Sequence, residues 1–151
     1  MRYSKEIKMR MVPDVYYVWV GGSCDYAHKE RAGGGAYIIE CNGRVTDTYI
    51  ISSFDTTEFR MMLTVMLHAM DTIPENSSIV FLTNVAYIQN FDNLKEGAAN
   101  SDLIERCIEA EKRHAAVSVK IVGYHKYHQL PDTHEMAHEA MNKLRRSDLN
   151  R

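Results

Sequence analysis

Residues 15–20 read Val-Tyr-Tyr-Val-Trp-Val, a continuous run of β-branched and aromatic residues that ends at a glycine pair. Such a run, without polar alternation, is typical of a strand that is buried on both faces of a sheet. Three glycines at 33–35 lead into a second strand-like segment at 36–40, and Asn42-Gly43 predicts a tight hairpin before a third segment at 45–52. We therefore expect a sheet that opens with three strands, of which the second and third run antiparallel.

The next segment, 56–71, is apolar at most of its positions. If it is helical, Arg60, Thr64 and His68, at intervals of four, form the one polar stripe along it. This spacing predicts a helix that is enclosed on nearly every side. Its methionines fit the role of adaptable core residues, because an unbranched thioether packs into irregular space. Pro74 ends the helical pattern.

The second half of the chain alternates between strand-like and helix-like segments. We expect strands at 79–83 and 117–122, a short helix at 85–91, a polar loop at 92–100, a helix from Ser101 as N-cap to His114, and a last helix at 132–146. The predicted order is β-β-β-α-β-α-α-β-α. It favours an α/β fold with a five-stranded mixed sheet, whose first three strands are antiparallel and whose later strands are parallel, with helices on both faces.

Composition limits the classes of function. The chain has 151 residues, of which 45% are hydrophobic and 25% charged, as expected for one ordinary domain. Its net charge of −2 provides no bulk attraction to nucleic acid or to an anionic membrane, so nucleic-acid binding would have to come from local patches. No apolar run is long enough to cross a bilayer, so we expect no membrane association. Three cysteines without a leader-like N-terminus indicate a reducing compartment, and we expect a cytoplasmic location.

Short motifs at the ends of these elements resemble those of the type 1 ribonuclease H family, in the same order and spacing. They are Gly21-Gly22-Ser23-Cys24, the segment 56–63, the segment 82–88, the segment 100–103 and Gly123-Tyr124-His125. The resemblance covers residues 15–143 and implies a ribonuclease H-like fold. We accordingly expect a basic N-terminal segment at 1–13, a ribonuclease H-like domain at 14–146 and a C-terminal tail at 147–151.

The resemblance also implies an activity, together with residues that the activity needs. The family cuts the RNA strand of RNA/DNA hybrids with two Mg²⁺ ions held by four carboxylates, because hard cations need oxygen ligands and a metal pair stabilises both ends of the displacement. At the four corresponding positions this chain carries Gly21, Met62, Asn84 and His134. The loop histidine His125 stands where the family keeps a histidine that helps product release. We therefore expect a fold without catalytic residues and without a cofactor.

Positions that contact the hybrid in the family differ as well. The paired threonines are present, but the two asparagines that usually follow them are replaced by Glu58 and Phe59. The candidates for contact with nucleic acid are Ser23, Cys24, Thr56, Thr57 and Glu58.

Three functions remain open on these residues. The first is a pseudoenzyme that acts as a binding or interaction module, with a protein partner or a second copy of itself and at most weak binding of nucleic acid. The second is a residual ribonuclease H that depends on Mg²⁺ or Mn²⁺, which requires nearby carboxylates such as Glu58 to rebuild the site. Geometry opposes the second, because a shift of a few residues changes the face of a helix or strand.

The third function is a transition-metal protein, in which Zn²⁺ binds through His125, His134 and His138. Helical spacing places His134 and His138 in one stripe of the last helix with Met141 and Arg145. A second stripe, with Ala137, Ala140 and Leu144, is expected to face the core. Surface histidines without a metal remain the commoner case for such a pattern.

Overall fold

The computed structural model describes residues 10–27, 30–89 and 100–149. Its elements are β1 (Val15–Cys24), β2 (Ala32–Cys41), β3 (Arg44–Phe54), α1 (Glu58–Thr72), β4 (Ser78–Thr83), the 3₁₀ turn η1 (Ala86–Ile88), α2 (Ser101–Glu111), β5 (Ala116–Ile121) and α3 (Gln129–Leu149). The predicted order of elements is confirmed, with a 3₁₀ turn in place of the short second helix.

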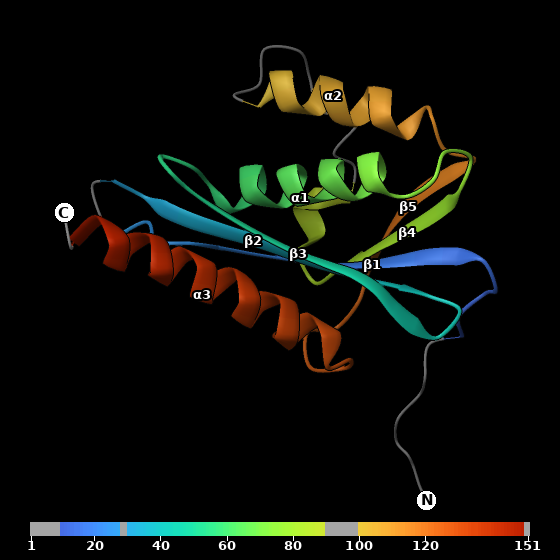
Figure 1. Ribbon diagram of the computed structural model, residues 1–151, viewed down its shortest axis with the longest axis horizontal. Helices are drawn as coiled ribbons and strands as arrows, with labels where there is room; N and C mark the ends of the chain where they lie inside the picture. Colours follow the sequence, from blue (N-terminus) through green and yellow to red (C-terminus); the bar gives the residue numbers. More distant parts are fainter. Residues whose placement is uncertain (1–9, 28–29, 90–99, 150–151) are drawn as a thin grey trace, which may run out of the picture.

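One five-stranded sheet runs through the molecule in the order β3-β2-β1-β4-β5. The pairs β1–β2 and β2–β3 are antiparallel, whereas β1–β4 and β4–β5 are parallel. Figure 1 shows α1 and α2 on one side of this sheet and α3 on the other. The predicted fold class is therefore confirmed. Because β1 and β4 are parallel neighbours, their carboxyl ends lie side by side at the same end of the sheet.

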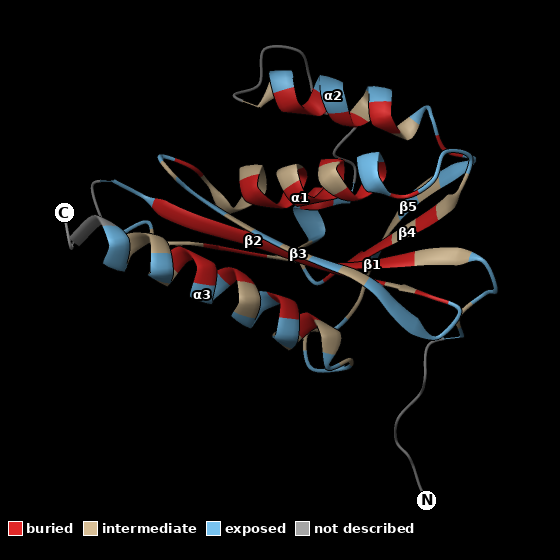
Figure 2. Ribbon diagram, viewed as in Figure 1, coloured by how far each residue is buried: buried red, intermediate tan, exposed pale blue. Residues whose placement is uncertain are grey.

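Side chains from the central strand β1 supply both layers of the core. Val18 and Val20 pack in the larger cluster beneath α1 and α2, whereas Tyr17 and Trp19 pack in the smaller cluster beneath α3. This division follows from the alternation of side chains along a strand. Figure 2 shows the buried centre of the sheet in red between the helices, with most of β3 exposed or half-buried.

The first three strands are longer than the sequence predicts. Each strand reaches beyond the segment predicted for it, namely 15–20 for β1, 36–40 for β2 and 45–52 for β3. Strand β1 continues through Gly21 and Gly22 to Cys24. The glycines do not end the strand, because those of β1 pair with the glycine-rich start of β2, with Gly22 opposite Gly35. The prediction that the glycine pair terminates the first strand is wrong.

The last helix begins earlier and ends later than predicted. It starts at Gln129 rather than near Asp132, which places Pro131 in its first turn. Proline is tolerated there because the first helical N–H groups have no partner within the helix. The helix also runs beyond residue 146 to Leu149, into the segment predicted as a tail.

The remaining boundaries shift by smaller amounts. Helix α1 begins at Glu58, and its N-cap is Thr57, whose side chain accepts a hydrogen bond from the Arg60 backbone N–H at 3.1 Å. Asn100, not Ser101, is the N-cap of α2, which ends at Glu111 rather than His114. The helix predicted at 85–91 is reduced to η1, and most of the predicted loop 92–100 lies outside the described residues, as do residues 1–9 of the basic segment.

None of the helices in the described ranges is both long enough and apolar enough to cross a membrane.

Candidate functional site

A pocket of about 350 Å³ lies at the carboxyl ends of β1 and β4, between the first turn of α1 and the beginning of α3. Three of the positions that the family resemblance singles out, Gly21, Asn84 and His134, line this pocket together. Sequence elements that are far apart therefore meet at the place where the parallel strands end, which is the usual position of a site in such sheets.

The fourth position, Met62, lies beneath the pocket rather than in its lining. Its side chain has no exposed surface, and its Cγ atom lies 2.9 Å from the point that a Cβ atom on Gly22 would occupy. A thioether in this place fills space between α1 and the sheet, and it is a soft ligand that does not suit Mg²⁺.

Helix α3 lies directly against Gly21. A Cβ atom at this residue would stand 2.9 Å from the backbone nitrogen of His134 and 2.9 Å from both the carbonyl carbon and the hydroxyl oxygen of Thr133. The same helix approaches β2 at Gly34, where an added Cβ would overlap the carbonyl group of Ala137. A side chain of any size at Gly21 therefore requires α3 to move.

Among the described residues, the pocket lining contains one carboxylate, that of Glu58. Its Oε1 atom accepts a hydrogen bond from the Tyr87 hydroxyl at 2.8 Å, and its backbone N–H donates to the Tyr26 hydroxyl at 3.1 Å. Burial and this carboxylate together raise the pKa of Tyr87 above its usual range, so the phenol stays protonated and remains a donor. Glu58 is thus tied to the segment that follows β4.

The histidines gather around Tyr124 at the other side of the pocket. The Tyr124 ring meets the His125 ring edge-on at a centroid distance of 4.9 Å and the His134 ring at 5.9 Å. The rings of His134 and His138 lie nearly parallel, 6.4 Å apart. Within residues 10–27, 30–89 and 100–149, no group of three or more His, Cys, Asp or Glu side chains is arranged to hold a metal ion.

The predicted division of α3 into two stripes holds in part. Ala137 and Ala140 are buried as expected, and His134 and His138 are exposed. Met141, however, is buried rather than placed in the flanking stripe with the histidines. The reason is the close approach of α3 to β2, which encloses Met141 beside the Ser23 hydroxyl of β1.

Four of the five candidates for nucleic-acid contact lie together at the start of α1. The Cys24 thiol donates to the Thr56 carbonyl oxygen at 3.5 Å, and Thr57 and Glu58 follow directly in the chain. Burial raises the pKa of the Cys24 thiol, which makes it a weak nucleophile. Ser23 instead points to the opposite face of the sheet, where its hydroxyl lies 3.4 Å from His138 Nδ1.

Sequence reasoning assigns no role to three tyrosines in or beside this pocket: it includes Tyr87 and Tyr124 only as members of family-like motifs, and it does not single out Tyr26. Tyr26, Tyr87 and Tyr124 all lie outside the strands and long helices, in or beside the segments that follow β1, β4 and β5. Their position directly after strands of a mixed sheet could have identified them, because the ends of parallel strands converge at one edge.

No protein-family model and no curated protein matches the sequence. Solved structures do match. LC9-RNase H1, described as a type 1 ribonuclease H with the type 2 active-site motif, has a TM-score of 0.70 and 20% identity over 89% of this chain and 75% of that one.

Two further ribonuclease H structures are similar to this chain over most of its length. The N-terminal ribonuclease H domain of a Mycobacterium tuberculosis protein, solved as a fusion with maltose-binding protein, has a TM-score of 0.71 and 9% identity over 89% of this chain and 98% of that one. Ribonuclease H1 from the archaeon Halobacterium salinarum NRC-1 has a TM-score of 0.67 and 10% identity over 85% and 98%. Likeness at such low identity establishes architecture rather than activity. The chain has the ribonuclease H-like fold.

Proposed function

We propose that this protein is a ribonuclease H-like pseudoenzyme, which does not cleave RNA/DNA hybrids and acts through binding. The observation that carries the proposal is the contact between α3 and Gly21, the position where the family resemblance places its first metal ligand. Protein atoms stand where the first carbon of a side chain at this position would have to lie, so the packing seen here leaves no room for a carboxylate.

The ligand chemistry of the remaining positions supports the same conclusion. Two Mg²⁺ ions need several oxygen ligands, and carboxylates provide the negative charge that offsets their dehydration. Asn84 supplies a neutral amide, His134 an imidazole, and Met62 a buried thioether. Glu58 alone cannot replace four carboxylates, and one of its oxygens already accepts the hydrogen bond from Tyr87.

The binding role rests on the pocket between α1 and α3 and on Cys24, Thr57 and Glu58 beside it. Thr56, the fourth member of that group, is buried and offers almost no surface to a ligand. With a net charge of −2 we expect any binding of nucleic acid to be weak, since strong binding depends on basic residues that neutralise phosphates. We also infer a cytoplasmic location. The three cysteines, Cys24, Cys41 and Cys107, are free thiols, as is usual in reducing compartments.

The direct test is an assay of cleavage and binding on a labelled RNA/DNA hybrid, with Mg²⁺ and with Mn²⁺. We expect no cleavage above background, and no rise in the thermal midpoint with either ion, because a bound ion would stabilise the folded state. Cleavage that survives repeated purification and disappears in Glu58→Gln would establish the residual nuclease instead.

A matched control separates that result from contamination. Glu75→Gln changes an exposed glutamate beyond the far end of α1, so it leaves the pocket intact. Cleavage that is equal in Glu58→Gln, Glu75→Gln and the unmodified protein does not depend on Glu58; if it is lost on further purification it comes from a contaminating enzyme, and if it persists it overturns the pseudoenzyme proposal.

A further inference from the structure

Strand β3 forms one edge of the sheet. It pairs antiparallel with β2 on one side, and in the part of the chain that the structure describes no strand pairs with its other side. Alternate residues of an edge strand direct their backbone N–H and C=O groups outward, which offers a template for another strand. In the view of Figure 1, β3 is drawn between the layer of α1 and that of α3.

The first half of β3 carries features that commonly prevent edge pairing. Arg44 is charged and exposed, and the register shifts between Ile39 and Glu40 of β2, which bends the strand opposite. Asp47 is charged as well, and its Oδ2 atom accepts the hydrogen bond of the Tyr37 hydroxyl at 2.7 Å. Charged residues and bulges of this kind protect edges from unwanted pairing.

The second half, residues 48–54, has no such protection. It reads Thr-Tyr-Ile-Ile-Ser-Ser-Phe, with no charged residue, no proline and no glycine. The Ile50 side chain is 50% exposed. At about 3.4 Å per residue these seven residues form an open edge roughly 24 Å long. The opposite edge strand, β5, carries the exposed Lys120 within its six residues.

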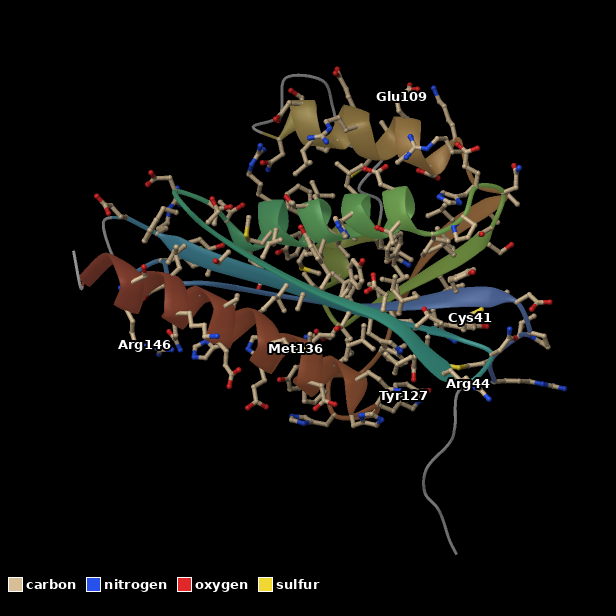
Figure 3. The ribbon with its side chains drawn as sticks, viewed as in Figure 1. Cys41, Arg44, Glu109, Tyr127, Met136 and Arg146 are labelled. Atoms are coloured by element: carbon tan, nitrogen blue, oxygen red, sulfur yellow. The ribbon has the colours of Figure 1, made fainter. Side chains whose placement is uncertain are left out.

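A hollow of about 260 Å³ adjoins this edge, between β3 and α3. Thr48 and Ile50 line it from the strand, and Met136, Glu139 and Lys143 line it from the helix. Figure 3 shows Met136 where α3 faces the sheet. Glu139 and Lys143 are both exposed and lie one helical turn apart, so this surface carries one charge of each sign.

We propose that residues 48–54 of β3 pair antiparallel with the same residues of a second copy of this chain, around a two-fold axis. The two sheets then form one continuous sheet, and the two α3 helices flank the junction. A second copy fits because a two-fold interface places each patch against itself. An uncharged strand then meets an uncharged strand, and Glu139 of each copy can approach Lys143 of the other.

The proposal goes beyond the loss of hydrolysis, since an active enzyme with this fold could pair through the same edge. Seven strand residues alone bury less than the roughly 1,200–2,000 Å² of a standard interface, so the surface of α3 must contribute. We therefore expect a dimer that dissociates on dilution through the micromolar range.

Sedimentation velocity over about 1 to 500 μM protein tests the proposal, since this range brackets a micromolar dissociation constant. In this register Ile51 pairs with itself, Ile50 with Ser52 and Thr48 with Phe54 of the other copy. We expect Ile50→Lys, whose two charges then lie diagonally across the strand pair, and Thr48→Lys, which sets a charge against the Phe54 ring, each to weaken the dimer at least about tenfold. Ser118→Lys, an exposed position on the opposite edge strand β5, should leave the dimer unchanged. Amide exchange in 48–54 should slow as the dimer forms.

The charges on α3 provide a second, independent test. Glu139→Lys should weaken the dimer several-fold, and adding Lys143→Glu to the same chain should restore it, because the two charges then exchange places. A wild-type chain that stays monomeric at the highest concentration overturns the proposal. So does a dimer that survives both strand variants, or one that Ser118→Lys disrupts equally. Circular dichroism verifies folding, and if Ile50→Lys fails to fold, Thr48→Lys and the α3 charge exchange still decide the question.

Discussion

Replacing Gly21 with alanine adds one methyl group where α3 crosses β1. The new carbon would lie 2.9 Å from the His134 backbone nitrogen and 2.9 Å from two atoms of Thr133, one of them its carbonyl carbon. Ordinary contacts begin near 3.4 Å, so the helix and the strand must separate by about 0.5 Å. Two of the three obstructing atoms belong to the backbone, so rotating a side chain relieves little of the overlap.

The surroundings determine how much this separation destabilises the protein. Thr133 and Ala137 on the same face of α3 have no exposed surface, and neither can move without opening contacts to β1 and β2. Overpacked sites of this kind lose about 1–3 kcal/mol of stability. With a middle value of about 2 kcal/mol and a urea m value near 2 kcal/mol/M, the midpoint should fall by roughly 1 M.

Equilibrium unfolding in urea measures this change. The single tryptophan, Trp19, lies 1% exposed on the α3 side of β1, so its fluorescence reports on this interface. Gly123→Ala is the matched control, because its added carbon would meet nothing closer than Lys126 Cβ at 3.7 Å. The control should stay within about 0.5 kcal/mol of the unmodified protein. If the stability of Gly21→Ala also stays within about 0.5 kcal/mol of the unmodified protein, the space beside Gly21 is not filled by α3, and the steric argument against a metal site is refuted.

Three further substitutions test the core. Met62→Glu places a carboxylate where no surface is exposed, so it should destabilise the fold by at least about 3 kcal/mol at pH 7. Burial raises the pKa of that group, so the loss should shrink between pH 7 and pH 4.5 in urea titrations. Burial also raises the pKa of Cys107 to about 12, so the folded thiol should resist a disulfide reagent. Because the folded state keeps this proton longer, the wild type should lose stability relative to Cys107→Ala as the pH rises above 9. Tyr37→Phe removes the hydroxyl that donates to Asp47 at 2.7 Å and lies 3.0 Å from His68 Nδ1, and thermal unfolding should show a loss of about 1–2 kcal/mol.

Local pattern was sufficient to predict the order of elements and the directions of the first strands. Asn42 and Gly43 have φ angles of 54° and 78°, the left-handed values that a two-residue hairpin turn requires, and Asn-Gly is the pair that adopts them most readily. The nearly apolar segment 56–71 likewise has few alternatives to an enclosed helix. In both cases the determining interactions lie within a short stretch of chain.

Element boundaries depended on contacts that the sequence does not display. Gly21 and Gly22 look like the end of a strand, yet they continue β1 because helices approach the sheet from both faces at these residues. Pro131 looks like a residue that precedes a helix, yet it lies inside the first turn of α3. Glycine and proline each permit more than one backbone arrangement, and tertiary packing selects between them.

The candidate site divides in the same way. That Gly21, Asn84 and His134 line one pocket was predictable from the order of motifs. The fold alone determines where strands end and helices begin, and these residues lie at such ends. The hydrogen bond between Tyr87 and Glu58 depends instead on how the segment after β4 is placed against α1, and no residue spacing encodes that distance. Side-chain partners between separate elements are therefore the part of the site that needed the structure.

In the proposed pseudoenzyme, packing as well as the absence of charge opposes metal binding at Gly21 and Met62. Four neighbouring carboxylates repel each other unless cations neutralise them, so such a site must stay open to metal and water. Where Gly21 stands, the backbone of α3 approaches β1, and where Met62 stands, a thioether fills the space under Gly22. Neither residue carries charge, and protein atoms occupy the space beside each of them. A carboxylate introduced at either position would meet both an unneutralised environment and an occupied volume, so a single such substitution should destabilise this fold rather than produce hydrolysis.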